Sequence, residues 1–395
     1  MKPKIRFKGF EGEWKTSTIG YFTTSFSGGT PTAGASEFYG GNIPFIRSGE
    51  IHESKTELFL TDAGLNNSSA KVVEKGTLLY ALYGATSGEV GISKIKGAIN
   101  QAILAIYPNK TVDKRFLANY LQSHKQKIVG ELLQGGQGNL SGALVKSISV
   151  TYPNNREQQT ISDYVDSLDS QISASTSRLA SLKQMKAASL QAMFPQEGKT
   201  VPKIRFKGFE GEWKKVKFSE LYERSSIKND LSFGTDKIIS VANMYFIKNS
   251  RQVDDDYLRS YNIMRLGDIA FEGNKSKNFA HGRLVENTIG DGIVSHVFIV
   301  MKPISKNYDL NFWKYYINNE NIMGNILVRS TKSSTMMTDL VVDDFLKESI
   351  LVPSYEEQIE IGKILTSLDR QISRQSQRLE KLKQIKSACL DKMFV

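Results

Sequence analysis

The sequence predicts an α+β fold in which two α/β domains of one design are joined by two long helices. Two repeated segments carry this prediction. Residues 3–15 and 202–214 have the same thirteen letters, PKIRFKGFEGEWK. Residues 153–194 and 353–394 share about 20 of 42 aligned positions, and both matches keep one spacing. The segments between the matches have nearly equal lengths but little common sequence, so one fold is expected to carry two different surfaces.

The repeat has a period of about 200 residues, which is far longer than the roughly 20–50 residues of a solenoid repeat. It therefore indicates two equivalent domains. Four consecutive segments follow: residues 1–152, a tag with the first variable domain; 153–195, a central long helix; 196–352, the repeated tag with the second variable domain; and 353–395, a C-terminal long helix.

Each similar segment is expected to form one long helix. Pro153 and Pro353 come just before the helices, and Asn154 or Asn155 in the first copy and Ser354 in the second can cap them. Neither helix is then interrupted by Gly or Pro over its main length. A helix of roughly 33 residues is about 50 Å long.

The apolar residues of these segments recur at spacings of 3, 4 and 7, which is the pattern of a seam between helices. They are Val165, Leu168, Ile172, Leu179, Leu182 and Met193 in the first copy and Leu365, Leu368, Ile372, Leu379, Leu382 and Met393 in the second. Because two matched seams would otherwise need two unrelated partners, pairing of the helices is favoured over packing of each on its own domain alone. Polar residues occupy two pairs of matching seam positions, Ser175 with Gln375 and Lys186 with Lys386, where they can fix the register.

The variable segments have a mixed pattern, with short β-type runs separated by Gly-rich turns and one helical stretch near the end of each. In the first segment the strands are expected at residues 43–51, 76–82, 102–108 and 147–153, and the helix at 114–133. In the second they are expected at 237–244, 267–273 and 292–301, and the helix at 311–326.

The composition is that of a soluble globular protein with a basic surplus. Lys and Arg number 52 against 41 Asp and Glu, a formal charge of +11 that favours a polyanionic partner, although many basic proteins bind none. No apolar run is long enough to span a membrane, and the N-terminus lacks the apolar region of a secretory signal. Cys389 is the only cysteine, so no intramolecular disulfide can form, and a reducing cytoplasm is expected.

Several loops of both variable segments are rich in side chains that hydrogen-bond bases or phosphates. Arg and Lys suit guanine, Asn and Gln suit adenine, and Gly lets the backbone approach a phosphate. A solvated turn is the better interpretation of any single loop, but the set together with the charge favours DNA. The candidate DNA-binding residues are Arg47, Ser48, Thr86, Ser87, Asn100, Gln101, Gln137, Asn139 and Ser141 in the first segment and Asn243, Lys275, Ser276, Lys277, Arg283, His296, Lys332, Ser333, Ser334 and Thr335 in the second.

The motifs of common catalysts are missing. The sequence has no Walker A loop, no G-x-G-x-x-G after a strand and no Asn/Asp-Pro-Pro-aromatic motif of the kind that amino-methyltransferases use. Its four histidines lack the spacing of metal ligands, and the acidic run at 254–256 is better explained as a solvated turn than as a metal site. These absences agree with one another and favour a recognition protein over a catalyst.

The chain resembles the specificity (S) subunits of type I restriction-modification systems over its whole length. The resemblance rests on the tag KIRFKGFEGEW, on GGTP at residues 28–31 followed by GGNIPFIRSGEI at 40–51, and on the P-x-x-x-E-Q start of each long helix. It rests also on SLDSQI and SLDRQI, each followed by R-L-x-x-L-K-Q-x-K. These motifs are specific in combination because most of them recur at one spacing in two copies.

The resemblance implies two pseudo-twofold-related α/β target recognition domains, joined by two long antiparallel helices that form a coiled coil. Each domain would read one half of a bipartite, asymmetric site in double-stranded DNA, and the coiled coil would set the gap between the halves. The conserved segments would dock two methyltransferase subunits and, through them, restriction or motor subunits in a bacterial cytoplasm. The partner subunits would use S-adenosylmethionine, ATP and Mg²⁺, while this chain would bind no cofactor or metal and perform no catalysis.

Three other functions remain open at this point. The first is a stand-alone, sequence-specific DNA-binding regulator with two recognition domains. The second is a self-sufficient nuclease or methyltransferase. The third is an assembly scaffold that does not bind DNA.

Overall fold

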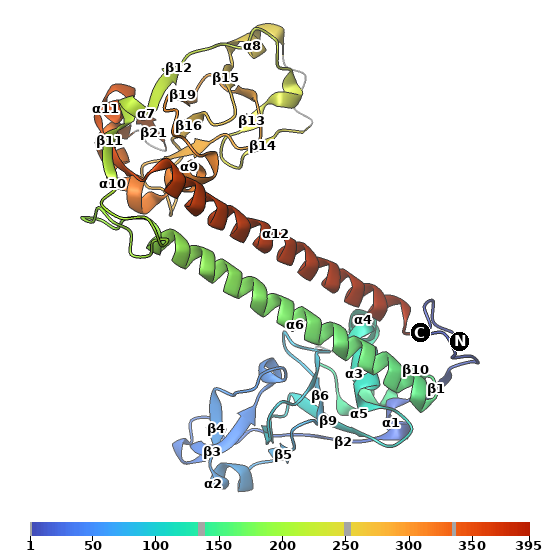
Figure 1. The fold of residues 1–395 in the computed structure, drawn as a ribbon. Coiled ribbons are helices and arrows are strands. Elements are labelled where there is room, and N and C mark those ends of the chain that lie inside the picture. The colour runs from blue at the N-terminus through green and yellow to red at the C-terminus, as the bar shows by residue number, and fades with distance from the viewer. Residues whose placement is uncertain (1, 133–138, 249–253, 334–336) are drawn as a thin grey trace. The chain divides into compact units, whose positions relative to one another are not determined.

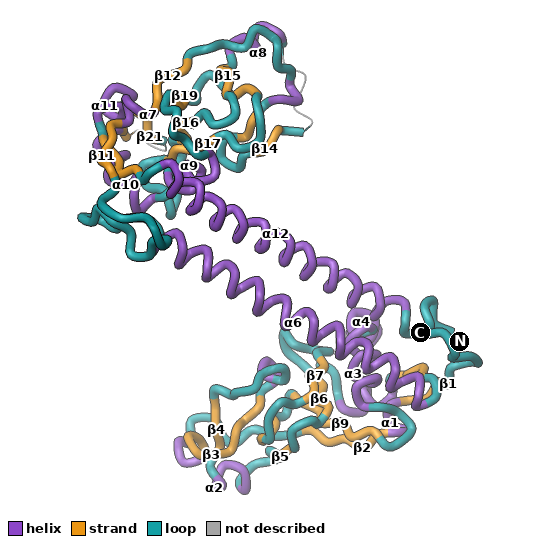
Figure 2. The backbone as a smooth tube through the Cα atoms, in the orientation of Figure 1, coloured by secondary structure: helices purple, strands orange, loops and turns teal. Residues whose placement is uncertain are grey.

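The computed structural model describes residues 2–132, 139–248, 254–333 and 337–395 (Figure 1). The chain forms two compact units, unit 1 with Met1–Thr176 and Arg378–Val395, and unit 2 with Ser177–Gln377. The long helices α6, Asn155–Ala192, and α12, Tyr355–Lys392, have 38 residues each, and each contributes to both units. Figure 2 shows both as continuous helices. The four segments predicted from the repeat stay a prediction, because the units are defined by contacts and not by the repeat.

The described residues of unit 1 form two four-stranded sheets, a two-stranded sheet and five short α-helices. The first sheet has the order β2 (Thr23–Ser27), β9 (Ile103–Pro108), β6 (Leu78–Ala81), β7 (Val90–Ile92), and the second β4 (Leu58–Leu60), β3 (Tyr39–Ile46), β8 (Gly97–Ile99), β5 (Lys71–Val73). The two-stranded sheet pairs β1 (Lys15–Thr18) with β10 (Ser149–Tyr152). The helices are α1 (Ile19–Phe22), α2 (Asp62–Asn66), α3 (Lys114–Ser123), α4 (Lys125–Leu132) and α5 (Gly142–Ser147).

Unit 2 contains one four-stranded sheet of the order β12 (Tyr222–Ser225), β19 (Ile299–Pro303), β16 (Ile269–Glu272), β17 (Arg283–Glu286). Four two-stranded sheets pair β11 (Lys214–Lys217) with β22 (Ser349–Val352), β13 (Ile239–Ser240) with β14 (Tyr245–Phe246), β15 (Asn262–Met264) with β18 (Gly292–Val294), and β20 (Thr331–Ser333) with β21 (Thr338–Leu340). The helices are α7 (Phe218–Leu221), α8 (Asp255–Ser260), α9 (Leu310–Tyr316), α10 (Glu320–Ser330) and α11 (Val342–Lys347).

The two units share one design, as the repeat predicts. The sheets β2-β9-β6-β7 and β12-β19-β16-β17 have the same antiparallel neighbours, and β9 and β19 each end opposite the start of the first strand, with Pro108 across from Thr23 and Pro303 across from Tyr222. The α+β fold class is therefore confirmed. The second sheet of unit 1, β4-β3-β8-β5, has a counterpart in unit 2 that is paired less completely. There β13 pairs with β14 and β15 with β18, and a parallel bridge between Ile238 and Ile293 links the two pairs, as β3 and β8 pair in parallel in unit 1.

Several predicted elements are shorter than the sequence indicated. The helix expected at 114–133 is broken at His124, whose ring stacks on Tyr120 at 4.3 Å between centroids. Burial lowers the pKa of His124. The helix expected at 311–326 is broken between α9 and α10, where the Asn319 side chain accepts a hydrogen bond from the backbone of Asn321 and so starts a new helix. The strand expected at 237–244 ends at Ser240, because a turn follows in which Met244 has a φ of 48°.

A buried ion pair joins the tag of each repeat to the start of its long helix. The Arg6 guanidinium donates from Nε and Nη2 to the two carboxylate oxygens of Glu157 at 2.7 and 2.8 Å. Arg205 and Glu357 make the same two bonds in unit 2, at 2.7 Å each. The Glu157 side chain is 0% exposed and that of Glu357 is 1% exposed. Because a buried carboxylate needs a charged or hydrogen-bonding partner, this pair fixes the tag on the helix.

The next residue of each helix, a glutamine, holds the variable domain on the helix start. The Gln158 side chain accepts from the Asp113 backbone N–H at 2.7 Å and donates to the Pro153 carbonyl at 2.8 Å. The Asp113 carboxylate in turn caps α3, accepting from the Arg115 and Phe116 backbone. Unit 2 repeats the arrangement, with Gln358 accepting from the Asp309 backbone at 3.2 Å and Asp309 capping α9. The Glu-Gln pair of the helix start is thus a structural element in both repeats.

Each unit takes the end of a long helix from the other repeat into its core. In unit 1, Phe394 at the end of α12 packs on Phe116, and the repeated Trp14 packs on the same ring at 5.9 Å. In unit 2, Phe194 at the end of α6 packs on Phe312 at 5.9 Å, as Trp213 does at 6.1 Å. These aromatic contacts join the tag, the helix end and the variable domain in each core.

Contacts within each unit show the two long helices paired in opposite directions. In unit 1, Lys386 of α12 donates to Asp169 of α6 at 2.5 Å, and Cys389, one turn further along α12, lies beside Tyr164, which is earlier in α6. In unit 2, Lys186 of α6 donates to Asp369 of α12 at 2.6 Å. The lysines predicted at matching seam positions therefore pair with the aspartates of the SLD motifs.

The predicted helix caps are confirmed, because the side chains of Asn154 and Ser354 accept hydrogen bonds from the backbone of Glu157 and Glu357.

The ion pair of the tag makes a stability prediction. We expect the substitution R6A to lower the free energy of unfolding of unit 1 by about 3 kcal/mol, because it leaves the buried Glu157 carboxylate without its partner. Urea unfolding measures the total loss, and hydrogen–deuterium exchange should locate it in residues 2–176 and not in 177–377. The matched control is R156A, an exposed arginine beside Glu157, which should change stability by less than about 0.5 kcal/mol. Equal losses in both variants would contradict the structural role of Arg6.

Candidate nucleic-acid interface

The equivalent four-stranded sheets have two different ends. At one end, which we call the loop edge, lie the loops that leave β2 and β6 and enter β7 and β9 in unit 1, and the loops at the corresponding strand ends of β12, β16, β17 and β19 in unit 2. At the other end, which we call the helix edge, β9 leads to Asp113 and so to the start of α6, as β19 leads to Asp309 and the start of α12.

In unit 1 the predicted loops meet around Leu82. The Leu82 backbone N–H donates to the Ala102 carbonyl at 2.8 Å, and its carbonyl accepts from the Leu140 backbone at 2.9 Å and from the Ser87 hydroxyl at 3.2 Å. The Asn100 backbone donates to the Ile46 carbonyl at 3.1 Å, which brings in the end of β3. All four groups of candidate residues in unit 1, which lie far apart in the sequence, are therefore connected at the loop edge.

The candidate side chains of unit 1 fall into two kinds. Some are used within the loops: Arg47 is paired with Glu50 and Glu57, which raise its pKa, the Ser141 hydroxyl caps α5, and the Asn100 side chain accepts from the Ala102 backbone. Others are accessible, with Gln101 and Asn139 exposed and Ser48, Thr86 and Ser87 half-buried, although Ser87 also donates to the Leu82 carbonyl and Gln101 also accepts from Thr30. Gln137 lies outside the described residues.

In unit 2 the predicted loops meet around Gly273 and Arg283. The Thr338 backbone donates to the Gly273 carbonyl at 2.8 Å, which ties the loop after β16 to the β20–β21 hairpin. The Arg283 guanidinium donates to Glu272 at 2.7 Å and to the Ala242 carbonyl at 2.6 Å, which adds the loop of Asn243. Ile299, which pairs with Phe271, follows the loop of His296 on the same edge.

Most of the candidate side chains of unit 2 are exposed. Arg283 is held in an ion pair and lies over the Phe279 ring at 5.0 Å. The exposed residues are Asn243, Lys275, Ser276, Lys277, His296, Lys332 and Ser333. Ser334 and Thr335 lie outside the described residues.

The glycines at the loop edge serve backbone packing rather than approach to a phosphate. A Cβ added to Gly28 would lie 1.9 Å from the Ile99 carbonyl oxygen, and one on Gly273 would lie 2.1 Å from that of Thr338. These glycines let two chain segments cross at van der Waals distance. Gly84 differs, because it has a φ of 83° with open space around it.

The structure adds residues that the sequence reasoning missed. Thr30 is exposed, and its hydroxyl donates to the Gln101 side chain, so the GGTP loop belongs to the loop edge of unit 1. Phe279 belongs to the loop edge of unit 2 through its contact with Arg283. The GGTP motif was a signal for Thr30. A single phenylalanine in a polar loop gave no comparable signal.

The most strongly perturbed carboxyl group lies away from the loop edge. Glu286 is 2% exposed, accepts from the Tyr308 hydroxyl at 3.0 Å, and burial raises its pKa well above the ordinary value. Tyr308 is bonded in turn to Tyr222 at 2.8 Å. Strong pKa shifts often mark active sites, but the hydrogen bonds of this network join Glu286 to tyrosines packed next to α9, which is typical of a structural network. Glu286 also lines a cavity with Lys314 and Tyr315.

Two further observations concern the described residues only. They hold no group of three or more His, Cys, Asp or Glu side chains placed to bind a metal ion. Their helices, α6 and α12 included, are not apolar enough over a sufficient length to cross a bilayer.

Comparison with known proteins gives one family and several relatives. The family model of the type I restriction modification DNA specificity domain matches residues 11–184 and again 210–384. A type I restriction enzyme MjaIX specificity subunit of Methanocaldococcus jannaschii is 29% identical over 170 residues, which are 40% of this chain and 38% of the relative. The EcoR124I/EcoR124II specificity subunit of Escherichia coli is 24% identical over 174 residues, which are 42% of this chain and 43% of the relative. The chain thus spans less than half the length of these curated relatives in the matched regions.

A solved structure has the same fold. The S subunit of a type I restriction-modification system from M. genitalium aligns with a TM-score of 0.61 at 16% identity, covering 100% of this chain and 99% of that one.

The exposed lysines at the loop edge make a prediction about salt dependence. If K277A and K332A together remove two phosphate contacts, the slope of log affinity against log salt for duplex DNA should become shallower by about 1.8. Fluorescence anisotropy over a salt series measures it. The matched control, K203A with K306A, removes two exposed lysines that lie away from the loop edge and should leave the slope unchanged. A slope that changes equally in both variants would show that the effect comes from net charge alone.

Proposed function

Because the chain belongs to the type I restriction modification DNA specificity family, we propose that it is the DNA sequence-specificity subunit of a type I restriction-modification complex. The observation that supports this most directly is the loop edge. Loops that are polar and different in sequence lie at the same end of the same sheet in both units, whereas the tags and helix starts are the same. Such a division suits a shared frame that carries two different reading surfaces.

The two units would read the two halves of a bipartite, asymmetric site in double-stranded DNA. Exposed amides such as Asn139 and Gln101 suit adenine edges, and exposed lysines such as Lys277 and Lys332 suit guanine or phosphate. Arg47 and Arg283 would act mainly by holding their loops, because carboxylates already occupy their guanidinium groups. The sequence difference between the two edges would make the half-sites different.

The repeated frame would dock two methyltransferase subunits and, through them, restriction or motor subunits. The Arg–Glu pairs and the helix starts occur twice in equivalent form, as two copies of one partner would require. The partners would use S-adenosylmethionine, ATP and Mg²⁺ and would perform the methylation and cleavage. This chain would supply recognition and assembly only.

The deciding experiment expresses the chain with a cognate methyltransferase subunit and maps methylated adenines across the host genome. The expected result is a bipartite motif with a spacer of several unspecified base pairs. A continuous palindrome would contradict the proposal. Tight, specific DNA binding by the chain alone, with no methyltransferase co-purifying, would instead favour a stand-alone regulator.

Modular reading makes a second prediction. Replacing residues 332–335 by the sequence of a related loop should change the half-site read by unit 2 and leave the other half intact. The reciprocal control replaces residues 100–101, which should change only the half-site read by unit 1. Both are measured as methylated motifs in the genome. Loss of both halves after either change would contradict independent reading.

The helices make a third prediction. Inserting one heptad into both α6, between Leu168 and Leu182, and α12, between Leu368 and Leu382, should lengthen the spacer without changing either half-site. Seven helical residues extend about 10 Å, which corresponds to about 3 base pairs. The control is an insertion of four residues in both helices, a stutter that unwinds the seam only locally, and it should lengthen the spacer by less than the heptad does. An unchanged spacer after the heptad insertion would show that the helices do not set the distance.

A further inference from the structure

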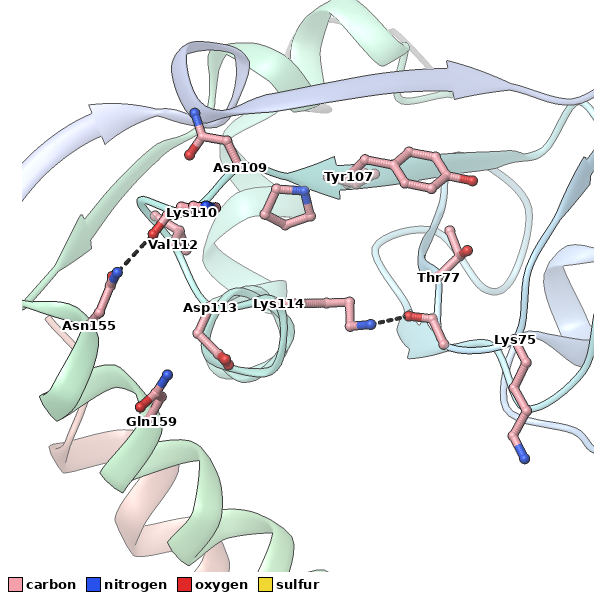
Figure 3. A pocket seen from close by; sticks show the side chains of 13 residues that line it. Lys75, Thr77, Tyr107, Asn109, Lys110, Val112, Asp113, Lys114, Asn155 and Gln159 are labelled. Carbon is pink, nitrogen blue, oxygen red and sulfur yellow. Dashed lines mark hydrogen bonds between the residues drawn. The ribbon is translucent and has the colours of Figure 1, made fainter.

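A basic cavity lies at the helix edge of unit 1, away from the loop edge. It has a volume of about 640 Å³ and is bounded by the residues before β6, those after β9, the start of α3 and the first turns of α6 (Figure 3). Lys75, Lys110 and Lys114 line it, each from a different segment of the chain. This size lies within the usual range of ligand pockets.

The charge around the cavity is positive and largely unopposed. The Lys114 ammonium donates to the Gly76 carbonyl, which leaves two of its three donors for another group. Lys75 and Lys110 are exposed and have no ion pair among the described residues. The one carboxylate in the lining, Asp113, is already engaged by the α3 backbone and the Ser162 hydroxyl. Gln159 is exposed on α6 and can add an amide donor.

Unit 2 repeats only one of these three lysines. Gly76 and Gly267 occupy equivalent positions before β6 and β16, each with a φ of 89°, and Asp113 and Asp309 occupy equivalent caps. Leu266 therefore stands where unit 1 has Lys75, and Leu310 where it has Lys114, whereas Lys306 stands at the position of Lys110. The two units differ here in a place that does not belong to the loop edge, so the cavity would serve an interaction that occurs once per chain.

We propose that this cavity binds carboxylate side chains of an acidic peptide segment on a protein partner. That the peptide belongs to a protein partner rests on the proposed function, in which the helix edge docks other subunits. A recessed site lined from four segments suits side chains that reach inward, whereas a duplex presents its phosphates along a convex rod. Three lysines that line one hollow select negative charge, and the Gln159 amide can add a hydrogen bond.

The test measures binding of a fluorescein-labelled peptide of eight glutamates to the full chain by anisotropy at about 0.15 M salt, where weak surface electrostatics are screened. The K75L/K114L variant carries the residues of unit 2 and should bind at least about tenfold more weakly. K75Q/K114Q repeats the test with polar side chains if the leucine variant fails to fold. The charge-matched control K8L/K146L removes two exposed lysines elsewhere in unit 1 and should bind as the unaltered chain does. The reciprocal L266K/L310K should add a second binding site.

The outcomes separate the alternatives. Equal weakening in K75L/K114L and K8L/K146L, or binding of an eight-glutamine peptide as tight as that of the glutamate peptide, would overturn the site. Weaker binding of a DNA duplex by K75L/K114L, with unchanged peptide binding, would overturn it in favour of a phosphate contact. Failure of the unaltered chain to bind any duplex would contradict the proposed DNA recognition, yet peptide binding lost only in K75L/K114L would still support the cavity.

Discussion

The structure depends on one interaction that occurs twice, the bidentate ion pair between an arginine of the tag and a glutamate in the first turn of a long helix. Glu157 and Glu357 are buried, and a buried carboxylate is stable only when its charge is met by close donors. The arginines supply these donors from 151 and 152 residues away in the chain. The tag is therefore held on the helix start, and the glutamine that follows holds the domain body on the same turn.

This frame explains why the repeated and the variable parts of the sequence lie where they do. The residues that must meet across long distances, the tag arginine, the tryptophan and the helix-end phenylalanine, are the same in both copies. The loops at the opposite end of the sheet are joined mainly by backbone hydrogen bonds, such as those of Leu82 and Gly273. Backbone bonds do not depend on side-chain identity. The loop edges can therefore differ in sequence while the sheet and helix start remain unchanged, which is the property that a pair of DNA readers needs.

The two units differ at the loop edge and at the helix edge, and the two differences would serve different functions. At the loop edge, the differing side chains would distinguish two half-sites. At the helix edge, two of the three cavity lysines of unit 1 correspond to leucines in unit 2, in a place where a symmetric pair of partners would meet the same chemistry twice. The frame thus combines features that occur in two copies with one charged cavity that occurs once. The same restriction-modification assembly could use both, since a specificity subunit with two domains can still present a single site.

The sequence by itself determined the duplication, the two long helices with their caps and seams, the α+β class and the loops that gather at the loop edge. These follow from local patterns: helical spacing, a proline and a cap, and a repeat long enough to exclude chance. Only the tertiary structure decided the roles of Arg47 and Arg283, which carboxylates engage, and of Gly28 and Gly273, which pack against backbone. It also decided that each unit encloses a helix end from the other repeat and that three lysines surround one cavity. A local pattern shows which groups a segment offers, but the partner that uses each group comes from residues far away in the chain, and only folding brings them together.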